Sequence, residues 1–301
     1  MRLRLANCRA RLFFKRIAYF NYKVGLDLSL IHPTAIIDSQ AELDPSVSVG
    51  PFSIIEGPVK VGHDTIIGPH VHLSGSTVIG ERNEIHIGAI IGHVPQHKAW
   101  KSGESGVRVG NDNVIREYAS IHRAYHGGQT TEIGDHNFLM GYSHVAHDVK
   151  IGDHVVLANG ALLAGHATVM DYANISGNVA VHQYVRIGRY AMIGGLARVS
   201  KDVPPFMMIE GNSEVKGLNT VGLRRGGYEL ASRQRIKKAF QILFRSGYNV
   251  AQAVEWLEAN MSDHADVLEI TEFIRGSARG ICRHTDSRLE YRDASDPVDD
   301  V

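Results

Sequence analysis

The residues best suited to chemistry lie in the segment Gly141–Asp148, which reads Gly-Tyr-Ser-His-Val-Ala-His-Asp. A histidine beside a carboxylate, as His147 is beside Asp148, can act as a general base near neutral pH. No serine or cysteine stands in a comparable setting. This favours direct attack by a bound acceptor over a covalent intermediate.

Other histidines gather around this segment. A lone surface histidine is usually only solvated, but several near each other indicate a functional cluster. The members are His122, His144, His147, His166 and His182. A metal site is the alternative, because histidine is the commonest transition-metal ligand. His144 and His147 are three residues apart, but on one strand and its turn their rings need not converge, and we predict no metal.

These residues are embedded in a six-residue repeat that runs from Ile31 to Val199. Of 29 positions six residues apart, 26 are Ile, Leu or Val, and the exceptions are His97, Gly103 and Gly127. A fixed short period indicates a solenoid of stacked turns, here a parallel β-helix. Each hexad is one short strand and a turn, with Gly, Asn and Asp supplying the permissive corners. Since Val145 points inward, His147 should face outward.

The repeat breaks at residues 97–108 and 124–132, where polar and glycine-rich stretches replace the core positions. We predict that both segments are loops that project from the coil. Loops on a rigid scaffold often carry binding or catalytic residues. The histidine cluster lies between and just after them.

The repeat resembles that of the hexapeptide-repeat acyltransferases, which form a left-handed parallel β-helix with three hexads per coil. This resemblance implies that residues 18 apart lie above one another. Gly165 would then lie over His147, where its N–H could receive an oxyanion. The same fold also occurs in a zinc-binding carbonic anhydrase class.

Composition sets further bounds. Lys plus Arg and Asp plus Glu balance at 32 each, so no net charge points to nucleic acid. Two cysteines imply no disulfide framework and a reducing compartment, and no apolar run is long enough to span a membrane. We expect a basic extension (1–30), the β-helix (31–205), a helical domain (206–284) and a disordered polar tail (285–301). The expected helices are Leu230–Phe244, Val250–Ala259 and Ala265–Ile274.

Residues 31–282 are similar throughout to the acyl-ACP:UDP-N-acetylglucosamine O-acyltransferase family, which catalyses the first step of lipid A biosynthesis. The matching stretches are Ile121-His122-Arg123, His144–Asp148, Leu163–His166, Ala180–Gln183, Asp202–Pro205, Gly222–Arg225 and Arg275–Gly280.

The resemblance implies a role for each matching residue. His147 would remove the proton from the glucosamine 3-hydroxyl, Asp148 would orient it, and the Gly165 N–H would stabilise the oxyanion. Gly195, with Gly177 beneath it, would measure the 3-hydroxyacyl chain. The residues that would position the nucleotide sugar, its phosphates and the pantetheine arm are Gln96, His122, His144, His166, His182, Gln183 and Arg225.

The resemblance also implies a cytoplasmic homotrimer with sites between neighbouring prisms. The helical end would help dock the acidic acyl carrier protein through Arg233, Arg235, Lys237, Lys238 and Arg245, or that basic face is merely solvated. No cofactor would be needed beyond the phosphopantetheine that the carrier protein brings.

This chain departs from the family pattern near the acceptor. It reads Gln96-His97-Lys98-Ala99 where Gln-Asp-x-Lys is usual, with Val221 in place of an acid and Gly226 in place of an arginine. A paralogue that acylates a different amino-sugar nucleotide is therefore the first alternative. The related N-acyltransferase is disfavoured, because it carries a uridine-binding domain before its β-helix. A zinc hydratase and a purely structural β-helix are the others.

Overall fold

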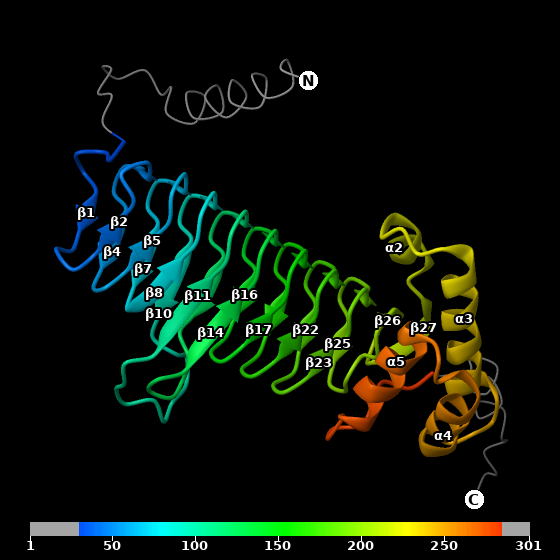
Figure 1. Ribbon diagram of the computed structural model, residues 1–301. Coiled ribbons are helices and arrows are strands. Elements are labelled where there is room, and N and C mark those ends of the chain that lie inside the picture. Colours follow the sequence, from blue (N-terminus) through cyan, green and yellow to red (C-terminus); the bar gives the residue numbers. More distant parts are fainter. Residues whose placement is uncertain (1–29, 285–301) are drawn as a thin grey trace, which may run out of the picture. The chain divides into compact units, whose positions relative to one another are not determined.

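The computed structural model describes residues 30–284, and most of them form a three-sided parallel β-helix (Figure 1). Up to β25, successive strands go to the three sheets in turn, so each strand pairs with the third one after it. Ile36 pairs with Ile54 and His144 with Leu162, both 18 residues apart. The predicted β-helix and its three hexads per coil are thus confirmed.

The strands are short because each hexad must also make a corner. Sheet 1 contains β1 (Ile36–Ile37), β4 (Ile54–Glu56), β7 (His72–Ser74), β10 (Ile90–His93), β13 (Ser120–His122), β16 (His144–Val145), β19 (Leu162–Leu163), β22 (Ala180–Val181) and β25 (Arg198–Val199). Sheet 2 contains β2 (Glu42–Leu43), β5 (Lys60–Val61), β8 (Ser76–Ile79), β11 (Gly106–Val109), β14 (Thr130–Ile133), β17 (Lys150–Ile151), β20 (Thr168–Val169) and β23 (Arg186–Ile187). Sheet 3 contains β3 (Ser48–Val49), β6 (Ile66–Ile67), β9 (Glu84–Ile85), β12 (Val114–Ile115), β15 (Phe138–Leu139), β18 (Val156–Leu157), β21 (Asn174–Ile175), β24 (Met192–Ile193), β26 (Met207–Glu210) and β27 (Glu214–Leu218).

The hexad positions form the core, as predicted. Leu73, Ile121 and Leu157 are fully buried, and each pairs with its counterpart in the next coil. Burying such a side chain contributes about 1.5–3 kcal/mol. The repetition of this layer makes the β-helix a rigid support for the loops.

Two loops leave the β-helix, and their bounds differ from the predicted 97–108 and 124–132. The first occupies residues 94–105, since β11 begins at Gly106, and the second occupies 123–129, since β14 begins at Thr130. Both strands are four residues long and pair with each other from Gly106↔Thr130 to Val109↔Ile133. This pairing draws residues into strands that the hexad pattern alone leaves in the loops.

The corners use a left-handed backbone conformation that we expected mainly at Gly, Asn and Asp. Asp148 adopts it, but so do many aromatic residues, among them Tyr172 and Tyr190. Their rings stack 4.6 Å apart, and Tyr172 also stacks on His154 at 4.7 Å. Ring stacking offsets part of the strain of this backbone conformation.

The β-helix ends later than residue 205. Strand β26 still pairs parallel to β24, and β27 then turns back antiparallel to β26. The helical end follows, and its last three helices agree with the prediction to within two residues, whereas the first was not foreseen. The helices are α2 (Thr220–Arg225), α3 (Leu230–Arg245), α4 (Val250–Met261) and α5 (Ala265–Arg275).

The expected extension, apart from Leu30, and the expected tail lie outside the described residues. Within residues 30–284, no helix has the length and apolar character needed to cross a bilayer.

Candidate active site

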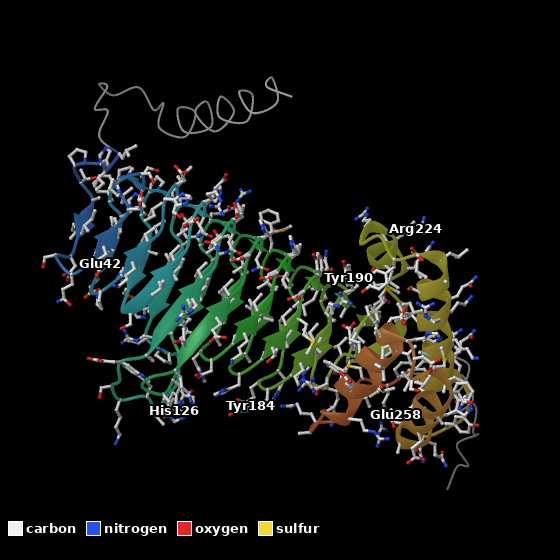
Figure 2. All side chains as sticks on the ribbon, in the orientation of Figure 1. Glu42, His126, Tyr184, Tyr190, Arg224 and Glu258 are labelled. Atoms are coloured by element: carbon white, nitrogen blue, oxygen red, sulfur yellow. The ribbon has the colours of Figure 1, made fainter. Side chains whose placement is uncertain are left out.

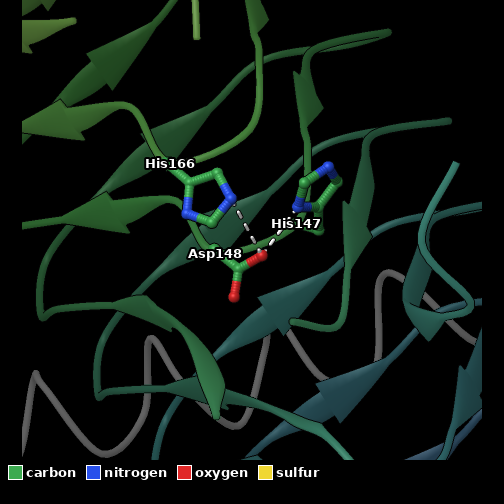
Figure 3. A group of neighbouring side chains, drawn as sticks. All are labelled: His147, Asp148 and His166. Carbon is green, nitrogen blue, oxygen red and sulfur yellow. Dashed lines mark hydrogen bonds and ion pairs between the residues drawn. The ribbon is translucent and has the colours of Figure 1, made fainter. Parts of the chain in front are cut away.

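His147 and Asp148 form a hydrogen-bonded pair at the corner between sheets 1 and 2, which we call the catalytic corner (residues 146–149, 164–167, 182–185 and 200–203). His147 Nδ1 lies 2.6 Å from Asp148 Oδ2 (Figure 3). The same oxygen accepts the Tyr125 N–H at 3.0 Å, and the carboxylate is almost buried. A proton on Nδ1 leaves Nε2 as the acceptor, so the pair has the geometry of an oriented general base.

Gly165 lies one coil beyond His147, as the 18-residue spacing predicts. A Cβ built on Gly165 would come 2.7 Å from His147 Cε1 and 2.8 Å from Nε2, so only glycine leaves room for the imidazole. Within residues 30–284 the Gly165 N–H donates no hydrogen bond. A free backbone donor therefore lies beside the proposed base, which is the arrangement that an oxyanion requires.

His166 joins this pair from the next coil. Its Nε2 is 3.6 Å from Asp148 Oδ2, and its ring stacks on Tyr184 at 4.5 Å. Burial lowers the pKa of His166 although Asp148 acts in the opposite direction. His166 is therefore mainly a neutral hydrogen-bonding group at neutral pH.

His122 and His144 lie on the outer surface of sheet 1, with their ring centroids 5.2 Å apart. His122 Nδ1 contacts the carbonyl of Val94 at 2.7 Å, and His144 Nδ1 contacts Ser120 Oγ at 2.8 Å. Burial lowers the pKa of His144 to about 4 and lowers that of His122. These rings are thus suited to hydrogen bonding and not to pairing with anions.

The first loop brings a residue to the base that the sequence did not assign to the site. The His97 ring lies 5.6 Å from that of His147 and 4.6 Å from that of Tyr125. Gln96 and His97 are both exposed. His97 occupies a position of the six-residue repeat where Ile, Leu or Val is expected. That exception was the one feature of the sequence that could have indicated a role for His97 in the site. Tyr125 donates its backbone N–H to Asp148, but nothing in the sequence indicated that it belongs to the site.

One group among the described residues offers ligands for a metal ion. His147, Asp148 and His166 each present one donor atom within 4.8 Å of the others. Two imidazoles and a carboxylate are a known zinc donor set. Asp148, however, already binds His147 Nδ1, and metal binding through that nitrogen would break the bond that orients the base.

Three of the predicted site residues lie on or beside the other two corners. Gly177 and Gly195 belong to the corner between sheets 3 and 1, with Leu196 exposed beside them. Arg225 ends α2, which Asn219 anchors to Tyr190 on the corner between sheets 2 and 3. Figure 2 shows the separation: His126 and Tyr184 lie along one edge, while Tyr190 and Arg224 lie along the opposite one. One prism therefore does not bring all the predicted residues together.

The six-residue repeat and the His147–Asp148 pair are the features expected of a hexapeptide-repeat acyltransferase, and the comparisons with known proteins identify this class. Residues 130–165 match the bacterial transferase hexapeptide family, and residues 202–282 match the family described as "Udp N-acetylglucosamine O-acyltransferase; Domain 2". The chain is thus a hexapeptide-repeat acyltransferase with a left-handed β-helix.

The particular family follows from full-length relatives. The acyl-[acyl-carrier-protein]--UDP-N-acetylglucosamine O-acyltransferases of Syntrophobacter fumaroxidans and Thermodesulfovibrio yellowstonii are both 46% identical, over 84% of this chain and 99% of theirs. The solved UDP-N-acetylglucosamine acyltransferase of Francisella novicida superposes with a TM-score of 0.83 at 34% identity, covering 90% of this chain and all of the other. The chain belongs to the UDP-N-acetylglucosamine O-acyltransferase family.

Proposed function

We propose that this protein transfers a 3-hydroxyacyl group from acyl carrier protein to the 3-hydroxyl of UDP-N-acetylglucosamine, the first step of lipid A biosynthesis. The observation that carries the proposal is the pairing of His147 with Asp148 beside the free N–H of Gly165. Those groups supply a base and an oxyanion donor, which are the two functions that acyl transfer without a covalent intermediate needs.

The reaction would use two proton transfers, the first from the sugar hydroxyl to His147 and the second from His147 to the leaving thiolate. His147 Nε2 takes the proton of the sugar hydroxyl as that oxygen attacks the thioester carbonyl, and Asp148 stabilises the imidazolium. The Gly165 N–H binds the negative oxygen of the tetrahedral intermediate. On collapse the C–S bond breaks, and the departing thiolate takes the proton from His147. No metal or redox step enters this scheme, and the phosphopantetheine arrives on the donor.

The faces of the prism support assembly with further copies of the chain. Sheet 1 exposes an apolar row, whose members Ile36, Ile54, Ile90 and Leu162 are 38–64% exposed. Sheet 2 instead carries ion pairs such as Lys60–Glu42. The corner between sheets 3 and 1 exposes Phe52, Tyr118, Tyr142 and Leu196. Large exposed apolar patches mark association surfaces.

A threefold assembly would cover these faces and complete the site. If sheet 1 of one copy packs on sheet 3 of the next, the apolar corner points to the axis and sheet 2 faces solvent. The outer edge of each interface then joins the catalytic corner of one copy to the neighbour's corner beside α2. Thus His147 of one subunit would meet Arg225 of another, and Gly195 would line the interior of the same interface. We therefore propose a homotrimer with three shared sites.

The donor and location follow from this reaction. Acyl carrier protein is an acidic protein, and the basic residues of α3, which include Arg233, Lys237 and Lys238, would favour its approach by charge complementarity. We also propose a cytoplasmic location, in keeping with a chain that has two cysteines, of which the described Cys282 is a buried thiol.

Incubation of the purified protein with UDP-N-acetylglucosamine and a series of 3-hydroxyacyl carrier proteins tests the reaction, with products identified by mass spectrometry. A mono-O-acylated nucleotide sugar is expected. If no such product forms, and a parallel incubation with another amino-sugar nucleotide gives an acylated amine, the first alternative is established instead.

The shared site has its own experiment. Subunits carrying His147→Ala and subunits carrying Arg225→Ala are unfolded together and refolded as mixed trimers. Activity below the KM for UDP-sugar should exceed that of either parent, because some interfaces then pair two unaltered residues. Activity equal to the mean of the two parents would show that each site lies within one subunit.

A further inference from the structure

A pocket of about 620 Å³ opens at the far end of the catalytic corner. Its walls come from the last coil, from strand β27 and from the segment that follows α5. The charged lining residues are Lys201, Glu214, Arg279 and Arg283, and serines supply much of the remaining polar surface. None of the roles assigned above uses this pocket.

The pocket is basic. Three cationic side chains face one carboxylate, and that carboxylate, Glu214, is itself paired with Lys216. Among the described residues Arg279 Nε has no hydrogen-bond partner. The excess of lysine and arginine side chains around the pocket makes it suited to an anion.

Arg279 also connects the pocket to the active site. Its guanidinium donates to the carbonyl of Gln183 and lies 3.2 Å from His182 Nδ1. Lys201 Nζ in turn donates to the Arg279 carbonyl at 2.7 Å. The pocket therefore continues directly from the residues predicted to hold the pantetheine arm.

The distance from the base is set by the coils. Lys201 lies 54 residues beyond His147 on the same corner, which is three coils. Neighbouring coils are separated by one strand spacing of about 4.8 Å, so the pocket lies roughly 14 Å from His147. An extended pantetheine arm, which separates a thioester from a phosphodiester by two amide units, is long enough to cover this distance.

We propose that this pocket binds the phosphodiester of the donor's phosphopantetheine through Arg279, Lys201 and Arg283. The inference rests on the proposed function, because a thioester held at His147 is what places the phosphate at this level. Arginine and lysine are the usual phosphate partners, and arginine can bind two phosphate oxygens at once. The pocket would thereby fix the depth to which the arm enters and hence the position of the thioester carbonyl.

The test compares two donors that differ only in the phosphate: 3-hydroxyacyl-4′-phosphopantetheine and 3-hydroxyacyl-pantetheine. The unaltered enzyme should use the phosphorylated donor with a kcat/KM at least about tenfold higher, the lower range for charge-assisted contacts. Arg279→Gln and Lys201→Gln should each remove most of this preference, with the KM for UDP-N-acetylglucosamine unchanged. Arg275→Gln is the matched control, because Arg275 is paired with Glu258 and does not line the pocket.

Equal use of both donors by the unaltered enzyme, or loss of the preference in Arg275→Gln as well, would overturn the proposal. Calorimetric binding of 4′-phosphopantetheine and pantetheine, with inorganic phosphate as competitor, needs no turnover. If the enzyme transfers no acyl group, the proposed function fails. Tighter binding of the phosphorylated arm that depends on Arg279 would then still support the pocket, whereas equal binding would reject it. Competition by millimolar phosphate against both arms equally would assign the pocket to free phosphate and contradict the proposal.

Discussion

The imidazole of His147 lies against Gly165 so closely that a Cβ on the glycine would come 2.7 Å from Cε1. The two residues are 18 apart, and the coil alone brings them together. We expect Gly165→Ala to displace the imidazole and lower turnover by at least roughly tenfold, since a displacement of even 1 Å in an active site can cost more than that. Gly127→Ala, in the second loop where the nearest atom lies 3.9 Å away, is the control and should retain activity in the same assay.

His147→Ala should lower kcat at least roughly 100-fold, because it removes the proposed general base. The fold and the assembly should persist, because His147 is a corner residue and not part of the apolar core. His136→Ala alters an exposed corner histidine and serves as control. Steady-state kinetics measure kcat for both variants, and sedimentation measures whether they still assemble. Near-normal turnover in His147→Ala would rule out His147 as the general base.

Arg225→Ala should raise the KM for the UDP-sugar more than it lowers kcat. Arg225 is exposed at the end of α2, and Gly226 follows it where the family resemblance leads us to expect a second cation, so one contact of about 1.5–3 kcal/mol would be lost. Arg224→Ala, on the same short helix, controls for charge. A fall in kcat at unchanged KM would contradict a binding role.

Gly195→Met should shift the preferred donor to a shorter acyl chain. A Cβ at Gly195 meets only the Gly177 carbonyl, at 3.6 Å, so the site has room for a longer side chain at the cost of ligand space. Methionine would replace about three methylenes of the donor, at about 0.8 kcal/mol each. Competition between donors of different length measures this, and an unchanged profile would reject the ruler. Leu196→Met alters the adjacent exposed residue and should leave the profile as it is.

Acidification should destabilise the protein between about pH 6.5 and 4. The pKa of His144 is about 4 in the folded state against about 6.5 when unfolded, so in this window the unfolded chain binds more protons. The unfolding free energy therefore falls as pH falls, and the full loss is reached below pH 4. Chemical denaturation of His144→Gln at pH 7 and pH 5 should show a smaller difference than the unaltered protein. His154→Gln, at an exposed corner, should keep the original difference.

The sequence predicted the parts of this molecule that depend on repetition. Regular Ile, Leu and Val spacing indicated the β-helix, and the three hexads per coil that the family resemblance implied put Gly165 over His147. It did not predict features created by pairing between distant segments. Strands β11 and β14 extend into the expected loops because they pair with each other, and Tyr125 holds Asp148 because a loop folds back. Arg279 was missed for the same reason, since nearly 100 residues separate it from His182 along the chain.

The length of a β-helix changes only by whole coils. The number of coils can therefore vary more freely at one end of the prism than at the other. The catalytic corner and the helical end that follows β27 are separated by a fixed number of coils, while a carrier's prosthetic arm has a fixed length. Deleting 18 residues between His147 and Lys201 would shorten that separation by about 4.8 Å and misplace the thioester. Deleting 18 residues between Ile37 and Ile79 would change no distance within the site. Coils should therefore be gained and lost at the N-terminal end of such prisms. The number of coils there does not have to match the length of any part of the substrate.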